Sequence, residues 1–359
     1  MAELRFHWGS SLDSGQKKST QKYRSDLLDL DGAIEFAQDA DALGVESLLM
    51  AQSYTLPDPL PIIGALARET ERVKFILAYR PGLLSPTLFA QIVNTVSWIS
   101  ERRIALNIVA GTSPAEQGYY GDFLAHDERY AREGEFLDIL HRLWGEGRPV
   151  TFTGDHYRVV DAQLGLGHRG GGRPEIYISG NSAVAQRTAI RYGDCWFRYG
   201  DTPEEIAKAA APLVAEGTDV GLRLQVLARE TREEALTELA EIMSETDENH
   251  RAYVKAFVEA GDSEAVKNSM RLAEQAGHGW LSPVLYSGAV AYRGGPALCL
   301  VGSYQEVAAY LMEYKAAGVG QFIFSGWPAR DEMRTFFTHV LPVVRAYEKD
   351  HDGALAGTR

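Results

Sequence analysis

The polar side chains that follow the apolar segments of this sequence include few groups that catalyse reactions by themselves. The ends of its predicted strands carry amides, hydroxyls and arginines, among them Arg80, Asn107, Ser179, Arg198 and Gln225. No pair of carboxylates stands at these ends, which argues against a glycoside hydrolase. No close-spaced pair of histidines stands there either, so the sequence does not predict a metal-dependent hydrolase. A site so poor in acids, bases and nucleophiles is typical of an enzyme that depends on an organic cofactor.

One strand end has the composition of an anion-binding turn. The segment YISGNS at Tyr177–Ser182 passes from an apolar strand into a helix, and it places Gly180, Asn181 and Ser182 where that helix begins. Free backbone N–H groups at a helix N-terminus attract phosphate. The turn is therefore a candidate site for the phosphate of a cofactor. The alternative is that Ser182 is an ordinary N-cap residue.

A second candidate region runs from Ile104 to Tyr130 and has the pattern of a strand, a long loop and a helix. The strand, Ile104–Val109, is largely apolar on both faces, as in a buried parallel sheet. Gly111 opens a loop of small polar residues, and a helix follows from His126. Long loops at the carboxyl end of a strand often carry function. Ser113–Glu116 also matches a capping box, which is compatible with a site beside it.

The elements that must position these residues alternate along the chain as strands and helices. Eight apolar strands are predicted, at residues 4–8, 45–50, 73–79, 104–109, 175–179, 195–198, 222–228 and 321–325. Helices between them are expected to begin at caps such as Asp31, Thr231 and Ser303. This alternation predicts an α/β fold, the (β/α)8 TIM barrel, with its active site at the strand C-termini. A doubly wound open sheet is the alternative, but Gly9-Ser10-Ser11 is not the glycine-rich fingerprint that normally follows its first strand.

Three segments depart from the alternation. Residues 150–160 are predicted to form a β-hairpin outside the barrel, with its turn at Thr153-Gly154-Asp155. Residues 247–298 contain two modest helical patches and a glycine-rich end, and we expect an insertion, or lid, over the C-terminal face. One barrel domain is expected to span residues 1–348, and residues 349–359 are expected to form a flexible tail.

The composition of the chain disfavours several classes of partner. A formal net charge of −13 argues against nucleic acid and against an anionic membrane, because both require a basic surface. The two cysteines, Cys195 and Cys299, lack metal-type spacing and fit a reducing compartment. No signal peptide or apolar run of transmembrane length is evident. We therefore expect a soluble, cytoplasmic protein.

Several stretches together resemble the bacterial-luciferase-like flavin-dependent monooxygenases, and within them the FMNH2-dependent alkanesulfonate monooxygenases. The resemblance covers almost all of the chain. It is carried by YRPGLLSPT at 79–87, NIVAG at 107–111, GDFLAHDERY at 121–130, ISGNS at 178–182, GLRLQVLARET at 221–231, YRGGPALCLVG at 292–302 and FSGWP at 324–328.

The resemblance implies a barrel that receives reduced FMN from an NAD(P)H-dependent flavin reductase and reacts it with O2. A flavin peroxide or hydroperoxide then oxygenates a small organic substrate. By this analogy His126, Tyr130 and the turn of Ser179, Gly180, Asn181 and Ser182 bind the cofactor around its ribityl phosphate. Asn107 is implied to lie near the isoalloxazine ring. For His126 and Tyr130 the alternative is the start of a surface helix.

The departures from the family pattern concern the substrate. Arg223 and Arg293 stand at the positions of active-site arginines in the sulfonate enzymes, where cations stabilise a peroxide or an anionic substrate. Gln225 replaces a histidine, and Trp327 replaces a tyrosine. Leu56 replaces a cysteine, and Arg198 stands where a small polar residue is usual. The reaction class is expected to be retained, with Arg223, Arg293, Gln225 and Trp327 as catalytic candidates and Arg198 and Leu56 as substrate-binding candidates.

Two alternatives and two further expectations follow from these residues. The alternatives are a deazaflavin-dependent oxidoreductase of the same superfamily and a flavin-binding protein without turnover. The apolar helices near residues 59–67 and 85–100 predict a homodimer or homotetramer. Arg198, if it has no partner, predicts a larger substrate with an anionic group and an apolar portion; pairing of Arg198 with Asp201 or Glu204 is the alternative.

Overall fold

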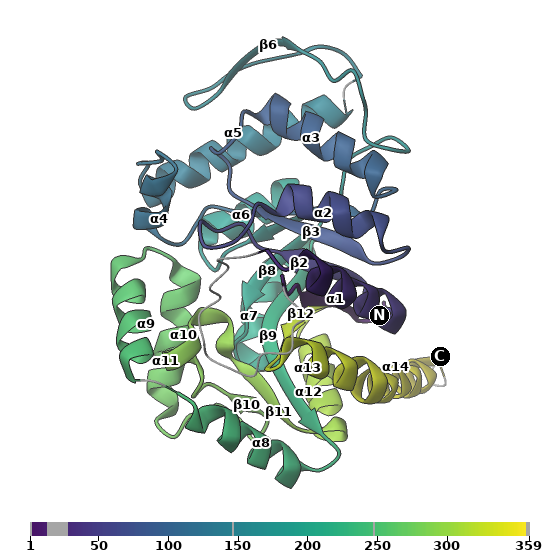
Figure 1. Ribbon diagram of the computed structural model, residues 1–359, viewed down its shortest axis with the longest axis vertical. Coiled ribbons are helices and arrows are strands. Elements are labelled where there is room, and N and C mark those ends of the chain that lie inside the picture. The colour runs from purple at the N-terminus through teal and green to yellow at the C-terminus, as the bar shows by residue number, and fades with distance from the viewer. Residues whose placement is uncertain (1, 13–27, 146, 247, 357–359) are drawn as a thin grey trace.

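The computed structural model describes residues 2–12, 28–145, 147–246 and 248–356, of which 351–356 are described by their backbone alone. Parallel strands form a closed ring at its centre (Figure 1). The ring consists of β1 (Arg5–Gly9), β2 (Ser47–Met50), β3 (Lys74–Tyr79), β4 (Ile104–Val109), β7 (Ile176–Ser179), β8 (Cys195–Tyr199), β9 (Asp219–Arg229) and β12 (Gln321–Ser325). Pairing of β8 with β9 closes it. These are the eight predicted strands, and the fold is the predicted α/β TIM barrel.

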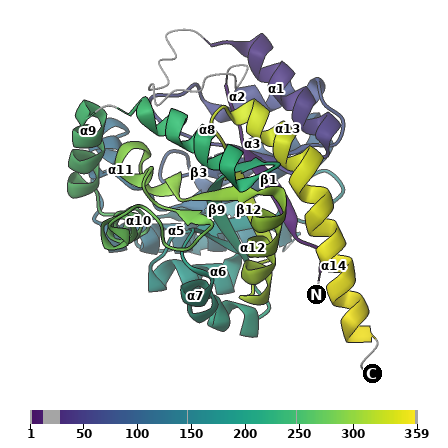
Figure 2. The same cartoon turned by 90° about the horizontal axis from the view of Figure 1, so that it is seen from below.

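Helices cover the outside of the ring and bury the largest apolar core against it (Figures 1 and 2). They are α1 (Leu30–Leu43), α2 (Pro59–Arg68), α3 (Pro86–Ile99), α4 (Pro114–Tyr119), α5 (His126–Gly145), α6 (Ala183–Tyr192), α7 (Pro203–Ala215), α12 (Tyr304–Ala316), α13 (Ala329–Thr335) and α14 (Leu341–Ala356), with a π-helical turn, η2 (Phe336–Val340), before α14. Thr231 and Ser303 form full capping boxes as predicted. The prediction that Asp31 caps the first helix is wrong. Asp29 is the cap, because its carboxylate accepts from Gly32 N, and Asp31 lies in the first helical turn.

The inside of the ring is filled differently at its two ends. Its middle is apolar, with Leu49, Ile76, Tyr177, Phe197 and Ile323 in one cluster. At the N-terminal end, the Arg5 guanidinium donates to both Glu46 and Glu175, and the Gln321 amide donates to Asp219. Ion pairs and amide hydrogen bonds therefore fill this end of the barrel. Space for a ligand remains at the C-terminal end, where the active sites of TIM-barrel enzymes lie.

The segment between β9 and β12 contains more than one βα unit. It forms α8 (Arg232–Ser244), α9 (Glu248–Ala260), α10 (Glu264–Ala276), β10 (Leu285–Tyr286), α11 (Val290–Arg293), η1 (Gly295–Ala297) and β11 (Cys299–Ser303) before α12. Helices α8 to α11 lie together on one side of the barrel (Figure 1). Strand β11 was not predicted. It exists because β9 is long enough to pair with β8 over residues 219–223 and with β11 over residues 225–229.

The predicted hairpin is confirmed as β5 (Val150–Thr153) and β6 (Arg158–Ala162). It lies beyond α3 and α5, away from the ring (Figure 1). The Glu135 carboxylate on α5 accepts from the backbone N–H groups of Asp155, His156 and Tyr157, so the turn of the hairpin is fastened to the barrel.

Helix α14 continues past residue 349 to Ala356, and the flexibility expected of residues 349–359 stays a prediction. Residues 357–359 lie outside the described part. The buried Glu348 carboxylate accepts from Lys315 Nζ and from Leu4 N, which anchors α14 to α12 and to the start of β1 (Figure 2). No helix in the described ranges is long and apolar enough to cross a membrane.

Candidate active site

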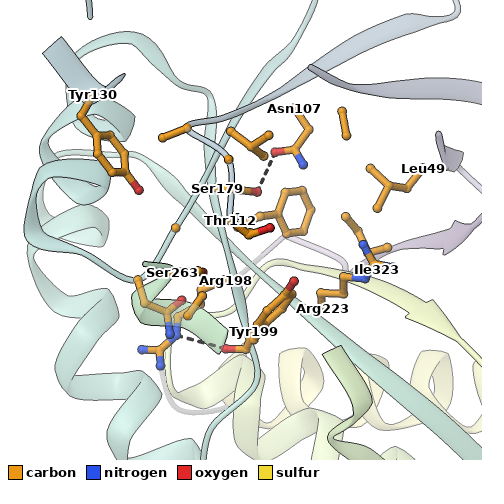
Figure 3. A pocket seen from close by; sticks show the side chains of 18 residues that line it. Leu49, Asn107, Thr112, Tyr130, Ser179, Arg198, Tyr199, Arg223, Ser263 and Ile323 are labelled. Carbon is orange, nitrogen blue, oxygen red and sulfur yellow. Dashed lines mark hydrogen bonds between the residues drawn. The ribbon is translucent and has the colours of Figure 1, made fainter. Parts of the chain in front are cut away.

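The carboxyl ends of the ring strands surround a pocket (Figure 3). Because side chains alternate along a strand, most of the ring strands direct an inward-facing residue near their carboxyl end into this space. The contributing side chains are Ala78 from β3, Asn107 from β4, Ser179 from β7, Tyr199 from β8, Arg223 from β9 and Ile323 from β12. The pocket therefore combines an apolar floor with amide, hydroxyl and guanidinium groups at its rim.

The turn between β7 and α6 forms one side of the pocket, which it lines with Gly180 and Asn181. Gly180 has φ +144°, and a Cβ at this position would lie 2.7 Å from the Tyr130 hydroxyl oxygen. Both polar atoms of the Asn181 amide are buried without a hydrogen-bond partner among the described residues. Ser182 caps α6 by accepting from Ala185 N at 3.3 Å. The turn thus presents an unsatisfied amide beside a helix N-terminus, a setting suited to an anionic ligand.

Tyr130 lies on α5 and contacts this turn across the pocket wall. Its side chain is buried, and burial raises the pKa of Tyr130 to about 12 against the opposing effect of a hydrogen bond with Ser182. The hydroxyl is therefore neutral at physiological pH and available as a donor. His126 is one turn earlier, with its ring 5.1 Å from that of Tyr130 and its Nδ1 2.8 Å from Asp127 Oδ1. His126 does not line the pocket itself.

Asn107 and Ser179 are joined across neighbouring strands. Asn107 is 6% exposed, and its Oδ1 accepts from the Ser179 hydroxyl at 2.7 Å (Figure 3). This hydrogen bond orients the Asn107 amide nitrogen toward the pocket as a donor. The two residues, both predicted from the sequence, belong to one unit of the site.

Two of the arginines predicted at the barrel mouth line the pocket, but their surroundings differ. Arg223 lies across the pocket from Tyr130 (Figure 3), its Nε is buried without a hydrogen-bond partner, and no ion pair to it is found within the described ranges. Arg198 is 9% exposed, with Nη2 3.2 Å from Asp201 Oδ2 and Nε donating to Tyr199 O. The expectation that Arg198 lacks a partner is wrong, and the alternative, pairing with Asp201, is confirmed; Asp201 lies in the loop just before α7.

The remaining catalytic candidates form a second group, outside the residues that line the pocket. The Arg293 guanidinium lies 4.1 Å from the centroid of the Trp327 ring, and burial lowers the pKa of Arg293 to about 10. Gln225 donates to Pro296 O at 3.2 Å, while its Oε1 is buried without a partner in the described structure. Leu56 is in the β2–α2 loop, partly buried against the main core, and does not line the pocket.

Several contacts at the site were missed by the sequence analysis. Glu116 does not complete a capping box with Ser113; its carboxylate pairs with the buried Arg80 at 3.3 Å. Thr112 and Ser263 line the pocket. The sequence around Ser263 matches a helix N-cap, but this pattern does not indicate that the helix begins beside the pocket.

Solved structures of other proteins share this architecture. The chain is similar to riboflavin lyase RcaE, solved with a modified FMN and riboflavin (20% identity, TM-score 0.77, covering 97% of this chain and 92% of that one). It is equally similar to EDTA monooxygenase EmoA from Chelativorans sp. BNC1 (20%, 0.77, covering 96% and 94%). An F420-dependent secondary alcohol dehydrogenase is similar at 17% identity and TM-score 0.68, covering 96% and 99%. Identities this low establish a common fold and nothing finer.

The family is established by the sequence itself. A model of the luciferase-like monooxygenases matches residues 4–321, and the chain belongs to that family. The TIM-barrel fold agrees with this membership.

Proposed function

We propose that the protein is the oxygenase component of a two-component monooxygenase that uses reduced FMN and O2. The observation that carries the proposal is the unsatisfied Asn181 amide at the N-terminus of α6, beside Gly180 and the neutral Tyr130 hydroxyl. Amide, hydroxyl and backbone N–H donors at a helix N-terminus fit a phosphate monoester such as that of FMN. Asn107, Ser179, Gly180 and Ser182 complete the cofactor-binding set.

Reduced FMN, when bound, supplies the two electrons with which O2 delivers one oxygen atom to an organic substrate and the other to water. The protein's own residues bind, orient and exclude water. Asn107, held by Ser179, presents a fixed amide donor, and the Arg223 guanidinium offers a positive charge that stabilises negative charge developing in the pocket. The predicted reductase partner is retained in the proposal, because reduced FMN must be supplied from outside and the chain lacks a dinucleotide-binding fingerprint.

The proposed substrate is not a simple alkanesulfonate, although the sequence resembles those enzymes. The argument for an anionic substrate now depends on Arg223, since Arg80 and Arg198 have carboxylate partners. The argument for an apolar portion depends on the apolar pocket residues Leu49, Phe197 and Ile323. A substrate with one anionic group and an apolar body would match both features, and Ile323 lies beside Arg223 on the neighbouring strand.

A titration separates this proposal from the deazaflavin alternative, which the similarity to an F420-dependent enzyme keeps open. The full chain is titrated anaerobically with reduced FMN, oxidised FMN and reduced F420. We expect reversible binding that favours reduced FMN, lost in Asn181→Ala and weakened in Tyr130→Phe. Turnover is then assayed with a flavin reductase and a panel of alkanesulfonates, carboxylates and aromatic acids. Preference for F420, or product formation without O2, would contradict the proposal.

A further inference from the structure

The loop between α9 and α10 is part of the pocket wall. Ser263 and Ala265, at the start of α10, line the pocket together with Thr112 from the loop after β4. A Cβ added to Gly261 would lie 3.1 Å from the Thr112 carbonyl oxygen, so the two backbones are in close contact. This wall comes from a segment far along the chain from β4, and something must hold it there.

A single buried arginine joins the three segments that meet at this wall. Arg129 on α5 is 2% exposed. Its Nε donates to Ala110 O at the end of β4 (3.0 Å), and its Nη1 donates to Leu124 O in the α4–α5 loop (3.0 Å). Its Nη2 donates to Asp262 Oδ2 in the α9–α10 loop (2.7 Å). All three nitrogens of the guanidinium therefore donate hydrogen bonds, and only the bond to Asp262 reaches the α9–α10 loop.

We propose that the ion pair of Arg129 and Asp262 positions the α9–α10 loop as a wall of the pocket and thereby retains the bound flavin. Asp262 is a positioning residue, because it does not line the pocket and acts through Ser263, Ala265 and Thr112. The inference rests on the proposed function for the identity of the ligand. The position of the loop itself can be tested without any ligand.

Burial is the reason to expect a measurable effect from this pair. The side chain of Arg129 is 1% exposed and that of Asp262 is 26% exposed. Removing the carboxylate would leave a buried guanidinium N–H without an acceptor, which is costly. The ion pair of Lys255 and Glu259 on α9 provides a matched contrast, with side chains 71% and 67% exposed, and such surface pairs contribute little.

A closed wall has a functional consequence for an oxygenase. Excluding water from the pocket would protect the activated oxygen that reduced flavin and O2 supply from being lost as hydrogen peroxide before it reaches a substrate. Loosening of the wall should therefore weaken retention of reduced FMN and divert oxidation toward hydrogen peroxide. Loss of an unrelated stabilising contact would lower stability without these two effects.

The experiment compares Asp262→Ala with Glu259→Ala in the full-length protein. Hydrogen–deuterium exchange without ligand is measured at residues 110–112 and 261–265, followed by anaerobic titration with reduced FMN. For Asp262→Ala we expect faster exchange in both segments, with the barrel strands unchanged, and a Kd for reduced FMN raised about tenfold. The KM for reduced FMN should rise with it, the kcat should change less, and the yield of peroxide should increase. Glu259→Ala should match the wild type, and Asp262→Asn, which keeps an acceptor for Arg129, should recover part of the loss.

Unchanged exchange at both segments in Asp262→Ala, or equal effects of the two alanine variants, would overturn the proposal. If Asp262→Ala does not fold, Gly261→Ala displaces the same loop by steric contact with Thr112 and is expected to give the same exchange pattern. Failure of the wild type to bind any flavin would contradict the proposed function alone. The exchange comparison would then still decide whether Asp262 holds the wall.

Discussion

Gly180 shows how one missing side chain shapes the side of the pocket that the β7–α6 turn forms. Its φ of +144° disfavours any residue with a Cβ, and the space that a Cβ would fill is taken by the Tyr130 hydroxyl and by Ala185 Cβ at 2.9 Å. Glycine satisfies both the positive φ and the lack of room for a Cβ, and this allows the turn to approach a ligand closely.

Gly180→Ala is expected to destabilise the fold by about 1–3 kcal/mol and to abolish binding of reduced FMN, since the added methyl displaces Tyr130. The control is Gly134→Ala in α5, where an added Cβ meets nothing within 4 Å. That substitution should stabilise the protein by about 0.5–1 kcal/mol and leave flavin affinity unchanged. Urea unfolding and flavin titration provide both measurements, and normal flavin binding by Gly180→Ala would refute the steric argument.

Glu133 is a second residue whose surroundings set its chemistry. It is fully buried on α5, and its two carboxylate oxygens have no hydrogen-bond partner among the described residues. Burial raises the pKa of Glu133 to about 8, against the opposing effect of Arg132. The folded state therefore keeps the proton through neutral pH, whereas the unfolded chain releases it near pH 4.5.

Because the folded pKa is the higher one, the stability due to protonated Glu133 is fully present below pH 4.5 and is lost as pH rises through about 8. In Glu133→Gln this dependence should vanish. The variant should gain about 3 kcal/mol relative to the wild type between pH 5 and pH 8. Urea unfolding at the two pH values measures this, with exposed Glu259→Gln as the control. Parallel pH profiles for Glu133→Gln and the wild type would refute the assignment.

At the scale of elements, the segment from α9 to η1 contacts the barrel at several places. The α9–α10 loop is paired with α5 through Asp262, Asn268 on α10 donates to Asp201 in the loop after β8, and α11 and η1 return the chain to β11. Near this return to β11, Arg293 lies over Trp327, the residue that by resemblance to the alkanesulfonate monooxygenases was expected to replace a tyrosine. Two Arg293 nitrogens, Nε and Nη2, are buried there without hydrogen-bond partners in the described structure, so the ring supplies the contact that hydrogen bonds do not.

We expect Arg293→Ala to lose product formation while keeping its fold, with more hydrogen peroxide released per flavin oxidised, because an arginine at this position can move over bound flavin and exclude water. Circular dichroism and a coupled peroxide assay measure the two parts. Arg251→Ala in α9, where the side chain is 54% exposed, is the matched control. Ordinary turnover by Arg293→Ala would exclude a role for this arginine.

At the scale of the whole molecule, the outer face of α3 is more apolar than a solvent-facing helix requires. Leu88, Trp98 and Ile99 are 44%, 48% and 38% exposed and recur on one side of the helix. Apolar surface of this kind in a soluble protein marks an interface. A homodimer or homotetramer therefore stays a prediction, with α3 as the assigned contact.

Light scattering at micromolar concentration should give twice or four times the mass of one chain. Leu88→Glu combined with Ile99→Glu should dissociate the assembly, since each chain would bury two new charges in the interface. Val160→Glu, at an apolar position on the hairpin that is more exposed (62%), should have no effect. A wild-type monomer would contradict the prediction.

The sequence by itself determined the features that depend on local spacing. The eight ring strands, the hairpin at β5 and β6 and the capping boxes at Thr231 and Ser303 were all readable, because apolar periodicity and capping act over a few residues. The barrel followed from their alternation. The turn at Gly180–Ser182 was identified by its composition, whereas His126 and Tyr130 came from the resemblance. Asn107, Tyr130, Ser179, Gly180 and Asn181 line the pocket, and His126 and Ser182 do not.

Only the tertiary structure decided which charged groups meet. Arg198 is paired with Asp201, Arg80 with Glu116, and Arg129 with Asp262, which is 133 residues away in sequence. Likewise β11 exists because β9 extends past β8, and Arg293 lies on Trp327 rather than among the pocket residues. Hydrogen bonds and ion pairs act within a few ångströms in space, and residue spacing carries no information about which distant segments the closed ring brings within that range.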